Sequence, residues 1–410
     1  MLRKFLTSTF KAGDLTVVFP DGQRQRFGDG TGPEVTVALT RRAIRRIAAS
    51  LSLGLGESYM DGDLSFERSD VFDLLELAGR NLGLRPPPGP HPLSQAWTWL
   101  ARHIQELNDR NLARRNVHHH YDLSEDLYRL FLDADMQYSC AYFARPDMSL
   151  EEAQAAKKAH IAAKLRLEPG MSVLDIGCGW GGMALTLAED YGARVHGVTL
   201  STEQLAVAER RARERGLTGR VRFTLTDYRD LRGPFDRIVS VGMFEHVGAP
   251  NYLAYFEQVR DLLTPDGIAL IHSIGRIDPP AVTSPFIAKY IFPGGSIPAL
   301  SEVTAAVEQS GLWTTDIEIL RLHYAETLRC WRMRFLTRRD AVRDMYDERF
   351  CRMWELYLGM SELSFRAGSH MVIQIQLARH VHAVPMVRDY MVDNERAAAK
   401  PALARRQARR

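Results

Sequence analysis

Val173-Leu-Asp-Ile-Gly-Cys-Gly-Trp-Gly-Gly182 begins as a short apolar run, typical of a buried β-strand, and leads into a segment with helical periodicity. Glycine lets a ligand approach the backbone closely, because a Cβ atom there would intrude. The amino terminus of the following helix offers unpaired N–H groups and a positive dipole. With strand, Asp175, glycines and helix in this order, the loop predicts a nucleotide-type binding site.

Strands and helices alternate around this loop. A capping box, Ser149-Leu-Glu-Glu152, begins a helix that we expect to run to about Leu167. Short apolar strands separated by helices are typical of βαβ units and a parallel sheet. We expect strands over 172–176, 194–199, 221–224, 235–241 and 268–274, and helices over 183–191, 204–215 and 252–263. Extended runs over 318–322 and 328–334 are interpreted as an antiparallel pair at the sheet edge.

The end of the second strand discriminates between two cofactor classes. A dinucleotide-binding site has the pattern Gly-x-Gly-x-x-Gly in the loop after the first strand and an acidic residue at the end of the second strand. The chain instead has Val198-Thr-Leu-Ser201 there, which favours an S-adenosylmethionine-dependent methyltransferase. We expect Thr199 and Gln204 to meet the ribose, and we include Leu200 in the cofactor site.

Two residues after the third strand are candidates for the adenine end of the same site. Asp227 can accept a hydrogen bond from the exocyclic N–H of adenine, and the ring of Tyr228 can stack on it. A turn or helix cap is the alternative role for Asp227. The fold class expected is therefore α/β, a class I S-adenosylmethionine-dependent methyltransferase domain of Rossmann-like type with additional C-terminal helices.

A proline-rich stretch divides the chain. Arg85-Pro-Pro-Pro-Gly-Pro-His-Pro92 has five prolines in eight residues, which excludes helix and central strand and indicates a linker. Residues 1–84 are expected to form a small α+β domain that contacts lipid at the membrane surface. Residues 93–395 are expected to form the catalytic domain, and residues 396–410 a basic, disordered tail.

The N-terminal domain has its own pattern of elements. Residues 14–27 alternate around Pro20-Asp21-Gly22 and predict a hairpin. A helix is expected over about 38–52, followed by a glycine-rich stretch from Gly54 to Gly62. A second helix is expected over 71–83.

Composition limits the classes of protein. The chain has 410 residues, with 53 Lys and Arg against 50 Asp and Glu, a balance that gives no indication of nucleic-acid binding. No window of about 20 residues is continuously apolar, so no transmembrane helix is expected, and Met1–Ala12 lacks a signal-peptide pattern. Four cysteines show neither disulfide nor zinc spacing, which favours a reducing, cytoplasmic setting.

Basic residues gather in two places. Arg41, Arg42, Arg45 and Arg46 lie on a predicted helix with Ile44 and Ile47 between them, which is consistent with a salt-bridged surface helix or with a membrane-surface helix. Residues 396–410 contain six basic residues and no acidic ones. This segment is either a solvated terminus or a tether to anionic lipid.

A series of motifs resembles one family, the cyclopropane-fatty-acyl-phospholipid synthases, and their relatives, the mycolic acid cyclopropane synthases. Residues 1–84 also resemble the smaller N-terminal domain of the phospholipid-acting bacterial members. The matching stretches, in order, are His120-Tyr-Asp-Leu123, Met136–Phe143, Val173–Gly182, Gly242–Gly248, Ile271–Gly275, Tyr290–Gly295, His323-Tyr324, Leu328–Phe335 and Arg352–Trp354.

The resemblance implies a reaction. The cis double bond of a membrane acyl chain attacks the methyl group of S-adenosylmethionine, a carbocation forms, and loss of a proton from the transferred methyl closes a cyclopropane ring. An alkene is a weak nucleophile, so the sulfonium must be held in line at short distance. The cation must be kept from water, which requires a dry, aromatic-lined pocket.

The resemblance also implies that a bound bicarbonate ion acts as the base. The matching positions are Cys140, Glu245, His272, the backbone of Ile274, and Tyr324. Glu245 and His272 follow predicted parallel strands, at the edge where open α/β sheets bind ligands. Glu245 can accept the proton of the bicarbonate hydroxyl and so orient the ion, leaving another oxygen as base.

Further positions follow from the resemblance. Tyr138, Ser139, Gly177, Gly179 and Trp180 match positions around S-adenosylmethionine. Ser361 stands where some members have a cysteine once proposed as catalytic, so no covalent cysteine nucleophile is expected. No metal is expected, because the consecutive residues His118–His120 do not share a helix face.

Several functions remain open at this stage. The leading prediction is cyclopropanation of phospholipid acyl chains by a peripheral protein at the inner face of the membrane. The alternative is a fatty-acyl methyltransferase of the same family that forms methyl- or methylene-branched chains. A lipid-binding module without the chemistry and a methyltransferase for small soluble molecules are less consistent with the motifs. A homodimer is possible, and the sequence does not indicate the preferred acyl chain, double bond or head group.

Overall fold

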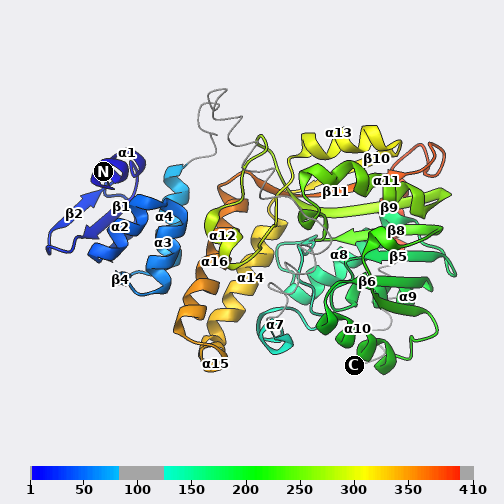
Figure 1. Cartoon of the computed structure of the whole chain (residues 1–410), viewed down its shortest axis with the longest axis horizontal. Helices are drawn as coiled ribbons and strands as arrows, with labels where there is room; N and C mark the ends of the chain where they lie inside the picture. Colours follow the sequence, from blue (N-terminus) through cyan, green and yellow to red (C-terminus); the bar gives the residue numbers. More distant parts are fainter. Residues whose placement is uncertain (1, 83–123, 398–410) are drawn as a thin grey trace. The chain divides into compact units, whose positions relative to one another are not determined.

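A computed structural model describes residues 2–82 and 124–397 of the chain (Figure 1). The predicted linker, His118–His120 and most of the predicted tail lie outside these ranges. Residues 389–397 are helical, so the first two residues of the predicted disordered tail belong to a helix.

The described residues divide into two compact units that do not follow chain order. One unit contains the residues up to 82 together with Val282–Pro293 and Ala325–His370. The other contains residues 124–281, 294–324 and 371–397. The domain boundary at 85–92 stays a prediction.

The larger unit is built on a seven-stranded sheet with the order β10-β11-β9-β8-β5-β6-β7. Strands β5 to β9 pair in parallel, whereas β10 and β11 pair antiparallel at one edge. The predicted parallel sheet is confirmed, and the five strands predicted for it overlap β5 to β9. The strands are β5 (Ser172–Ile176), β6 (Arg194–Thr199), β7 (Val221–Leu225), β8 (Phe235–Val241), β9 (Leu263–Arg276), β10 (Trp313–Leu320) and β11 (His370–Ala378).

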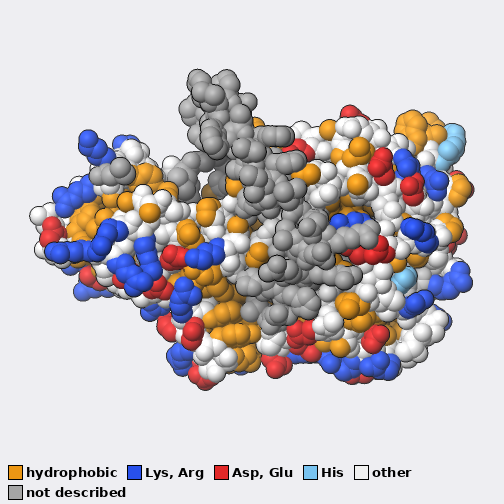
Figure 2. All heavy atoms as spheres, viewed as in Figure 1, with side chains coloured by type: hydrophobic (Ala, Val, Ile, Leu, Met, Phe, Trp, Pro, Cys, Tyr) orange, Lys and Arg blue, Asp and Glu red, His pale blue; other side chains and the backbone are white. Residues whose placement is uncertain are grey.

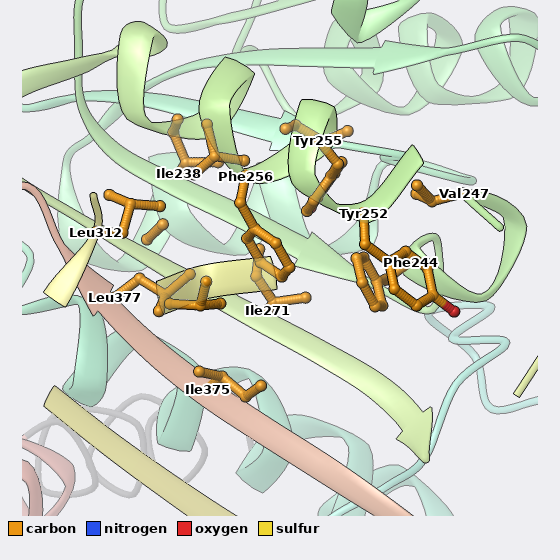
Figure 3. Packing of buried hydrophobic residues seen from close by; sticks show 14 of the residues in the cluster. Ile238, Phe244, Val247, Tyr252, Tyr255, Phe256, Ile271, Leu312, Ile375 and Leu377 are labelled. Atoms are coloured by element: carbon orange, nitrogen blue, oxygen red, sulfur yellow. The ribbon is translucent and has the colours of Figure 1, made fainter. Parts of the chain in front are cut away.

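Apolar clusters cover both faces of this sheet. Leu174 and Ile176 of β5 belong to one cluster, in which Phe256 and Ile271 pack closely (Figure 3). Val173 points to the other face, because successive side chains of a strand alternate. Burial on both faces explains why the strands read as apolar runs. The helices of this unit are α7 (Glu125–Phe131), α8 (Leu150–Leu165), α9 (Gly182–Tyr191), α10 (Thr202–Glu214), α11 (Tyr252–Leu262) and α13 (Leu300–Ser310).

The capping box that begins α8 is confirmed. Ser149 Oγ accepts from Glu152 N at 3.3 Å, and Glu152 Oε2 accepts from Ser149 N at 3.0 Å. Two otherwise unpaired donors at the helix start are satisfied in this way. The helix therefore starts at a fixed residue, which fixes the positions of the lysines further along it.

The predicted strand over 328–334 is wrong. These residues lie in helix α14 (His323–Thr337), and β10 pairs with β11 instead. Leu328, Trp331 and Phe335 are buried, and their spacing of three and four residues follows a helical period. The short apolar run concealed that period.

The smaller unit contains a four-stranded sheet with the order β2-β1-β3-β4. The predicted hairpin is confirmed, since Leu15 pairs with Phe27 and Val18 with Arg24 in antiparallel register. The strands are β1 (Asp14–Val18), β2 (Arg24–Phe27), β3 (Glu34–Leu39) and β4 (Leu64–Glu67). The helices beside them are α1 (Leu2–Thr9), α2 (Arg41–Ala49), α3 (Leu51–Met60) and α4 (Val71–Leu82).

The prediction of a single helix over 38–52, followed by a glycine-rich stretch, is wrong in its division into elements. Two helices occupy this region, and the glycines up to Gly56 lie inside α3. A Cβ on Gly54 would lie 2.1 Å from Arg46 O, and one on Gly56 would lie 2.3 Å from the Phe286 ring. These glycines therefore permit close packing rather than a turn.

Three further helices complete the smaller unit with the rest of α14. They are α12 (Pro285–Tyr290), α15 (Arg339–Met345) and α16 (Glu348–Arg366). Tyr59 of α3 donates from its hydroxyl to Glu355 Oε2 at 2.8 Å, and Lys289 Nζ contacts Glu57 Oε1 at 2.7 Å. Segments more than 200 residues apart thus share one unit.

Lysine and arginine side chains gather on the surface of the N-terminal strands and helices (Figure 2). Arg46 lies 2.7 Å from Asp61, and Arg42 lies 3.4 Å from Asp63. Arg42 and Arg46 of the predicted basic cluster are therefore salt-bridged, and Arg42 is exposed, as are Arg41 and Arg45. Among the helices that the structure describes, none has the length and apolar character needed to cross a bilayer.

Candidate active site

The glycine-rich loop connects β5 to α9, as predicted. The amides of Gly177 and Cys178 both donate to Val198 O at 3.0 Å, which ties the loop to the end of β6. Gly179 has φ +52°, and the space where its Cβ would stand is open. The start of α9 follows, where a helix has N–H groups without intrahelical partners. The loop therefore has both the room and the donors that a ligand needs.

The ends of β6 and β7 place the predicted ribose and adenine residues. Thr199 Oγ1 donates to Gln204 Oε1 at 2.9 Å, and both side chains are buried at the start of α10, next to half-buried Leu200. Asp227 caps a short turn and pairs with Arg229 at 2.6 Å. The Tyr228 ring packs edge-on against Tyr255. The capping alternative for Asp227 is thus observed, and its contact with adenine stays a prediction.

The segment from Asp133 to Cys140 lies against the start of α9. A Cβ on Gly182 would lie 2.1 Å from Gln137 Nε2 and 2.5 Å from Asp135 Oδ2, so a larger residue there would have to displace these side chains. Asp135 also forms salt bridges with three cations from α8 and from the end of α10. These are Lys158, Arg211 and Arg215.

Arg211 extends this contact to the loop itself. Its Nη1 donates to Trp180 O at 2.6 Å. The buried ring of Trp180 lies 5.7 Å from Tyr128, which lies 5.1 Å from the half-buried ring of Tyr138. The ring of Tyr128 thus lies between those of Tyr138 and Trp180, and the contact of these two residues with the cofactor stays a prediction.

Helix α8 fixes the position of Ser139. Lys157 is wholly buried and donates to Ser139 Oγ at 2.8 Å and to Gln137 Oε1 at 2.7 Å. One turn earlier, Gln154 Nε2 donates to Ser139 O at 2.9 Å. Burial lowers the pKa of Lys157 to about 8. Both the side chain and the carbonyl of Ser139 are thus held by one helix.

Glu245 and Ile274 meet at the carboxyl ends of β8 and β9. The amide of Ile274 donates to Glu245 Oε1 at 2.6 Å. Glu245 Oε2 is buried and has no hydrogen-bond partner within the described part of the chain. Burial raises the pKa of the Glu245 carboxyl to about 7. Glu245 can therefore exist in either protonation state near neutral pH, and it has an oxygen available for a ligand.

His272 lies in the same region, opposite Val241 in the parallel register of β8 and β9. It is buried, and its Nδ1 lies 3.1 Å from Gln374 Nε2 of β11. Burial, together with the nearby charges of Lys157 and Lys164, holds the pKa of His272 well below its ordinary value. The ring is neutral at physiological pH.

Cys140 and Tyr324 are linked to each other through their neighbours. The amide of Phe143 donates to His323 Nδ1 at 3.0 Å, and the Tyr142 ring stacks on His323 with centroids 5.0 Å apart. This contact joins the segment after Cys140 to the start of α14. Both Cys140 and Tyr324 are buried.

Comparison with known proteins agrees with this arrangement. A family model described as mycolic acid cyclopropane synthetase matches residues 108–375. The chain belongs to this family. A second model, described as a domain of unknown function, matches residues 1–83.

Individual relatives cover most of the chain. The cyclopropane-fatty-acyl-phospholipid synthase of Escherichia coli K12 is 42% identical over 338 residues, which is 82% of this chain and 86% of that protein. The tuberculostearic acid methyltransferase UfaA1 of Mycobacterium tuberculosis is 38% identical over 89% of this chain and 88% of that protein. A solved mycolic acid cyclopropane synthase, CmaA1 complexed with SAH and CTAB, has 36% identity and a TM-score of 0.63, covering 67% of this chain and 99% of that one.

These findings confirm the predicted enzyme class and fold class. The protein is an S-adenosylmethionine-dependent methyltransferase with a Rossmann-like α/β core. The roles of the individual site residues within this family fold stay predictions.

Sequence reasoning missed the polar residues that support the site. Lys157 and Lys164 on α8, Asp135, Arg211 and Gln374 are all at least partly buried and engaged in hydrogen bonds. One signal was available, since Lys157 and Lys164 lie seven residues apart and so share a helix face with apolar Ile161 and Leu165. Their partners, distant in sequence, gave no such signal.

Proposed function

We propose that this protein transfers a methylene group from S-adenosylmethionine to the cis double bond of unsaturated phospholipid acyl chains and forms a cyclopropane ring. The similarity to the Escherichia coli synthase supports this substrate class, because it extends over 82% of the chain. The second family model matches residues 1–83, which lie outside the 108–375 match to the mycolic acid cyclopropane synthetase model.

The observation that carries the proposal is the buried carboxyl of Glu245. Its Oε1 accepts from Ile274 N, while Oε2 is buried without a partner among the described residues. A buried polar atom without a partner is costly, unless a ligand satisfies it. The site therefore favours a small ligand that carries an O–H group.

Bicarbonate fits these residues. It carries one O–H group and acceptor oxygens, and Glu245 Oε2 offers an acceptor for that O–H. His272 and Tyr324 carry N–H and O–H groups that can donate to the acceptor oxygens, and Cys140 would complete the set. When bound there, bicarbonate would supply the base that removes a proton from the transferred methyl.

The chain's own residues orient the reactants and exclude water. S-adenosylmethionine supplies the electrophilic methyl group, and the glycine-rich loop with Ser139 and Tyr138 would hold it beside the carboxyl ends of β5 and β8. His272 and Cys140 are buried, and so is the Oε2 atom of Glu245, so these groups act in a medium of low dielectric constant. Burial strengthens each hydrogen bond there and keeps water from a carbocation.

Mass spectrometry of lipids tests this function. Purified protein, S-adenosylmethionine and unsaturated phospholipid vesicles should give a gain of one CH₂ per reacted chain, with loss of alkene reactivity. Glu245→Gln should abolish this gain while S-adenosylhomocysteine binding is retained. Glu168→Gln, at an exposed carboxyl, should retain both. Transfer at the wild-type rate by Glu245→Gln would refute the assigned role.

A methyl- or methylene-branched product is the second candidate. The name of the 38% identical tuberculostearic acid methyltransferase favours it, because the same carbocation can lose its proton from a different carbon. The mass gain is then the same for a methylene-branched chain, but the product still reacts as an alkene. The product is therefore treated with hydrogen over a catalyst and its mass is measured again. A methylene-branched chain reacts as an alkene and gains two hydrogen atoms, whereas a cyclopropane chain does not react as an alkene.

Contact with the membrane is proposed to involve the exposed arginines of α2. Arg41 and Arg45 are exposed, whereas Arg42 and Arg46 are salt-bridged. Binding to anionic vesicles should fall with added salt and in the Arg41→Gln/Arg45→Gln variant. The same charge change at exposed Arg220 and Arg222 should have less effect. Equal losses would refute a specific contact through α2.

We also propose that the protein forms a homodimer and is located in the cytoplasm. Size-exclusion chromatography with light scattering tests the homodimer.

A further inference from the structure

Three buried side chains from three elements form a hydrogen-bonded series that ends at His272. Lys164 of α8 donates from Nζ to Gln374 Oε1 at 2.8 Å. Gln374 of β11 has its Nε2 3.1 Å from His272 Nδ1. Lys164 and Gln374 are no more than 1% exposed, and His272 is 2% exposed, so water does not compete for these contacts.

The direction of each hydrogen bond is fixed by the lysine. A protonated ammonium group has donors and no acceptor, so the atom of Gln374 that faces Lys164 must be the amide oxygen. The amide nitrogen must then face His272, and this nitrogen can only donate. His272 Nδ1 therefore has to accept, which requires that Nδ1 carries no proton.

We propose that Lys164 and Gln374 are positioning residues that hold His272 as the neutral tautomer with its proton on Nε2. In this form His272 presents an N–H donor to a ligand and offers no basic nitrogen to it. The inference rests on the proposed function only in assuming that an oxygen-bearing ligand lies at His272.

The neighbours of Lys164 support its charged form. Glu318 Oε2 accepts from Lys164 Nζ and lies 2.7 Å from His160 Nε2, and His160 Nδ1 lies 3.0 Å from Glu395. Burial opposes the ionisation of Glu318, but His160 and Lys164 together lower its pKa to about 2. Burial lowers the pKa of Lys164 from its ordinary value, but the carboxylates of Glu318 and Asp316 oppose this shift. They favour the ammonium form on which the direction of the series depends.

The surroundings of His272 disfavour its protonation. Burial is the main cause of its lowered pKa, and the positive charges of Lys157, Lys164 and His160 act in the same direction. A neutral ring in a fixed tautomer behaves as an electrophilic hydrogen-bond donor. The proton released in the proposed reaction would then go to another group in the site and not to His272.

Nuclear magnetic resonance of the full-length protein labelled with ¹⁵N-histidine tests the tautomer directly. The His272 signals are assigned by their loss in His272→Asn. In the wild-type protein, Nδ1 should resonate as an unprotonated ring nitrogen and Nε2 as a protonated one. A proton on Nδ1 of the wild-type protein would overturn the proposal.

Gln374→Glu should move the proton of His272 from Nε2 to Nδ1. The new carboxylate can accept a hydrogen bond from Nδ1–H and another from Lys164 Nζ. Gln376→Met is the matched control, since Gln376 is an equally buried glutamine on β11 that bonds to Lys164 O and to Tyr390 but is not bonded to His272. Its His272 signals should match those of the wild type. An unchanged tautomer in Gln374→Glu would contradict the proposal.

A second variant covers the case in which Gln374→Glu does not fold. Lys164→Met removes the ammonium group, so the amide of Gln374 can turn and both His272 tautomers should be observed. A single unchanged tautomer in Lys164→Met would overturn the role of Lys164. The resonance measurement needs no turnover, so absence of methylene transfer would refute the proposed function and leave the tautomer result valid.

In the transfer assay, Gln374→Glu should lower kcat at least tenfold, whereas Gln376→Met should retain the wild-type value within about threefold. The KM for S-adenosylmethionine should change little in both, because neither residue contacts the glycine-rich loop. Equal losses of kcat in the two variants would indicate a purely structural effect.

Discussion

Removal of the Asp135 carboxylate should make the backbone amides of the glycine-rich loop more accessible to solvent. It pairs with Lys158 and Arg211, each of which has a side chain only 10% exposed, and lies 3.3 Å from Arg215. Removing one partner of a buried ion pair costs about 3–5 kcal/mol, because the other charge stays buried. Asp135→Asn keeps a hydrogen-bond acceptor and the site is 16% exposed, so we expect the lower value, about 3 kcal/mol.

Hydrogen exchange followed by mass spectrometry measures this loss locally. A loss of about 3 kcal/mol corresponds to roughly 100-fold faster exchange of amides over 133–140 and 177–182. The matched control is Asp147→Asn, whose 3.3 Å contact with Arg145 is exposed at both ends. Such a pair contributes about 0–1 kcal/mol. Equal exchange in the two variants would refute the role of Asp135.

The effect of Asp135 should depend on pH in one direction. Burial opposes its ionisation, but Lys158, Arg211 and Arg215 outweigh burial and lower its pKa. A carboxyl with a lowered folded-state pKa stabilises the protein above its unfolded pKa of about 3.9, and this contribution is lost as pH falls through the folded value. Wild type and Asp135→Asn should therefore converge in acid and differ fully at neutral pH.

Three further changes have defined expectations. Because burial raises the pKa of Glu245 to about 7, the unfolding free energy of the wild type should fall as pH rises from about 4.3 toward 7. Relative to the wild type, Glu245→Gln should gain up to about 4 kcal/mol of unfolding free energy by pH 8 and little at pH 4. A pH-independent difference in unfolding midpoint would contradict this. Phe256→Ala, at a fully buried ring, should cost about 3–5 kcal/mol of unfolding free energy, whereas Leu225→Ala, at a half-exposed side chain, should cost far less. Gly182→Ala should weaken binding of S-adenosylhomocysteine in calorimetry, because Gln137 must move, and Gly219→Ala, with open space around it, should not.

The core of the larger unit could be predicted from sequence because its signals are local. Val173–Gly182 contains a strand, a glycine turn and a helix start within ten residues, and each is explained by neighbours along the chain. Burial on both faces makes the strands continuous apolar runs, which are easily recognised. The capping box at Ser149 is local in the same sense.

The errors and omissions arose where tertiary contacts override local signals. Gly54 and Gly56 ended the helical pattern in the sequence, yet they lie inside helix α3, where the lack of a Cβ lets Arg46 O and the Phe286 ring approach closely. Lys164 and Gln374 lie 210 residues apart, so their hydrogen bond has no signature in either local sequence. The positioning residues of the site therefore required the structure.

The interleaving of chain segments in the smaller unit has a consequence for biosynthesis. The hydroxyl of Tyr59 contacts Glu355, a residue 296 positions later, and Gly359 packs against Leu75 and Phe72. At about 5–20 residues per second, a ribosome needs roughly 15–60 s to make that interval. Residues 2–82 have an apolar cluster of their own and can begin to fold, but α3 and α4 must wait with apolar surface uncovered until α16 is made. Nascent chains stalled before residue 348 should therefore engage chaperones more than full-length chains do.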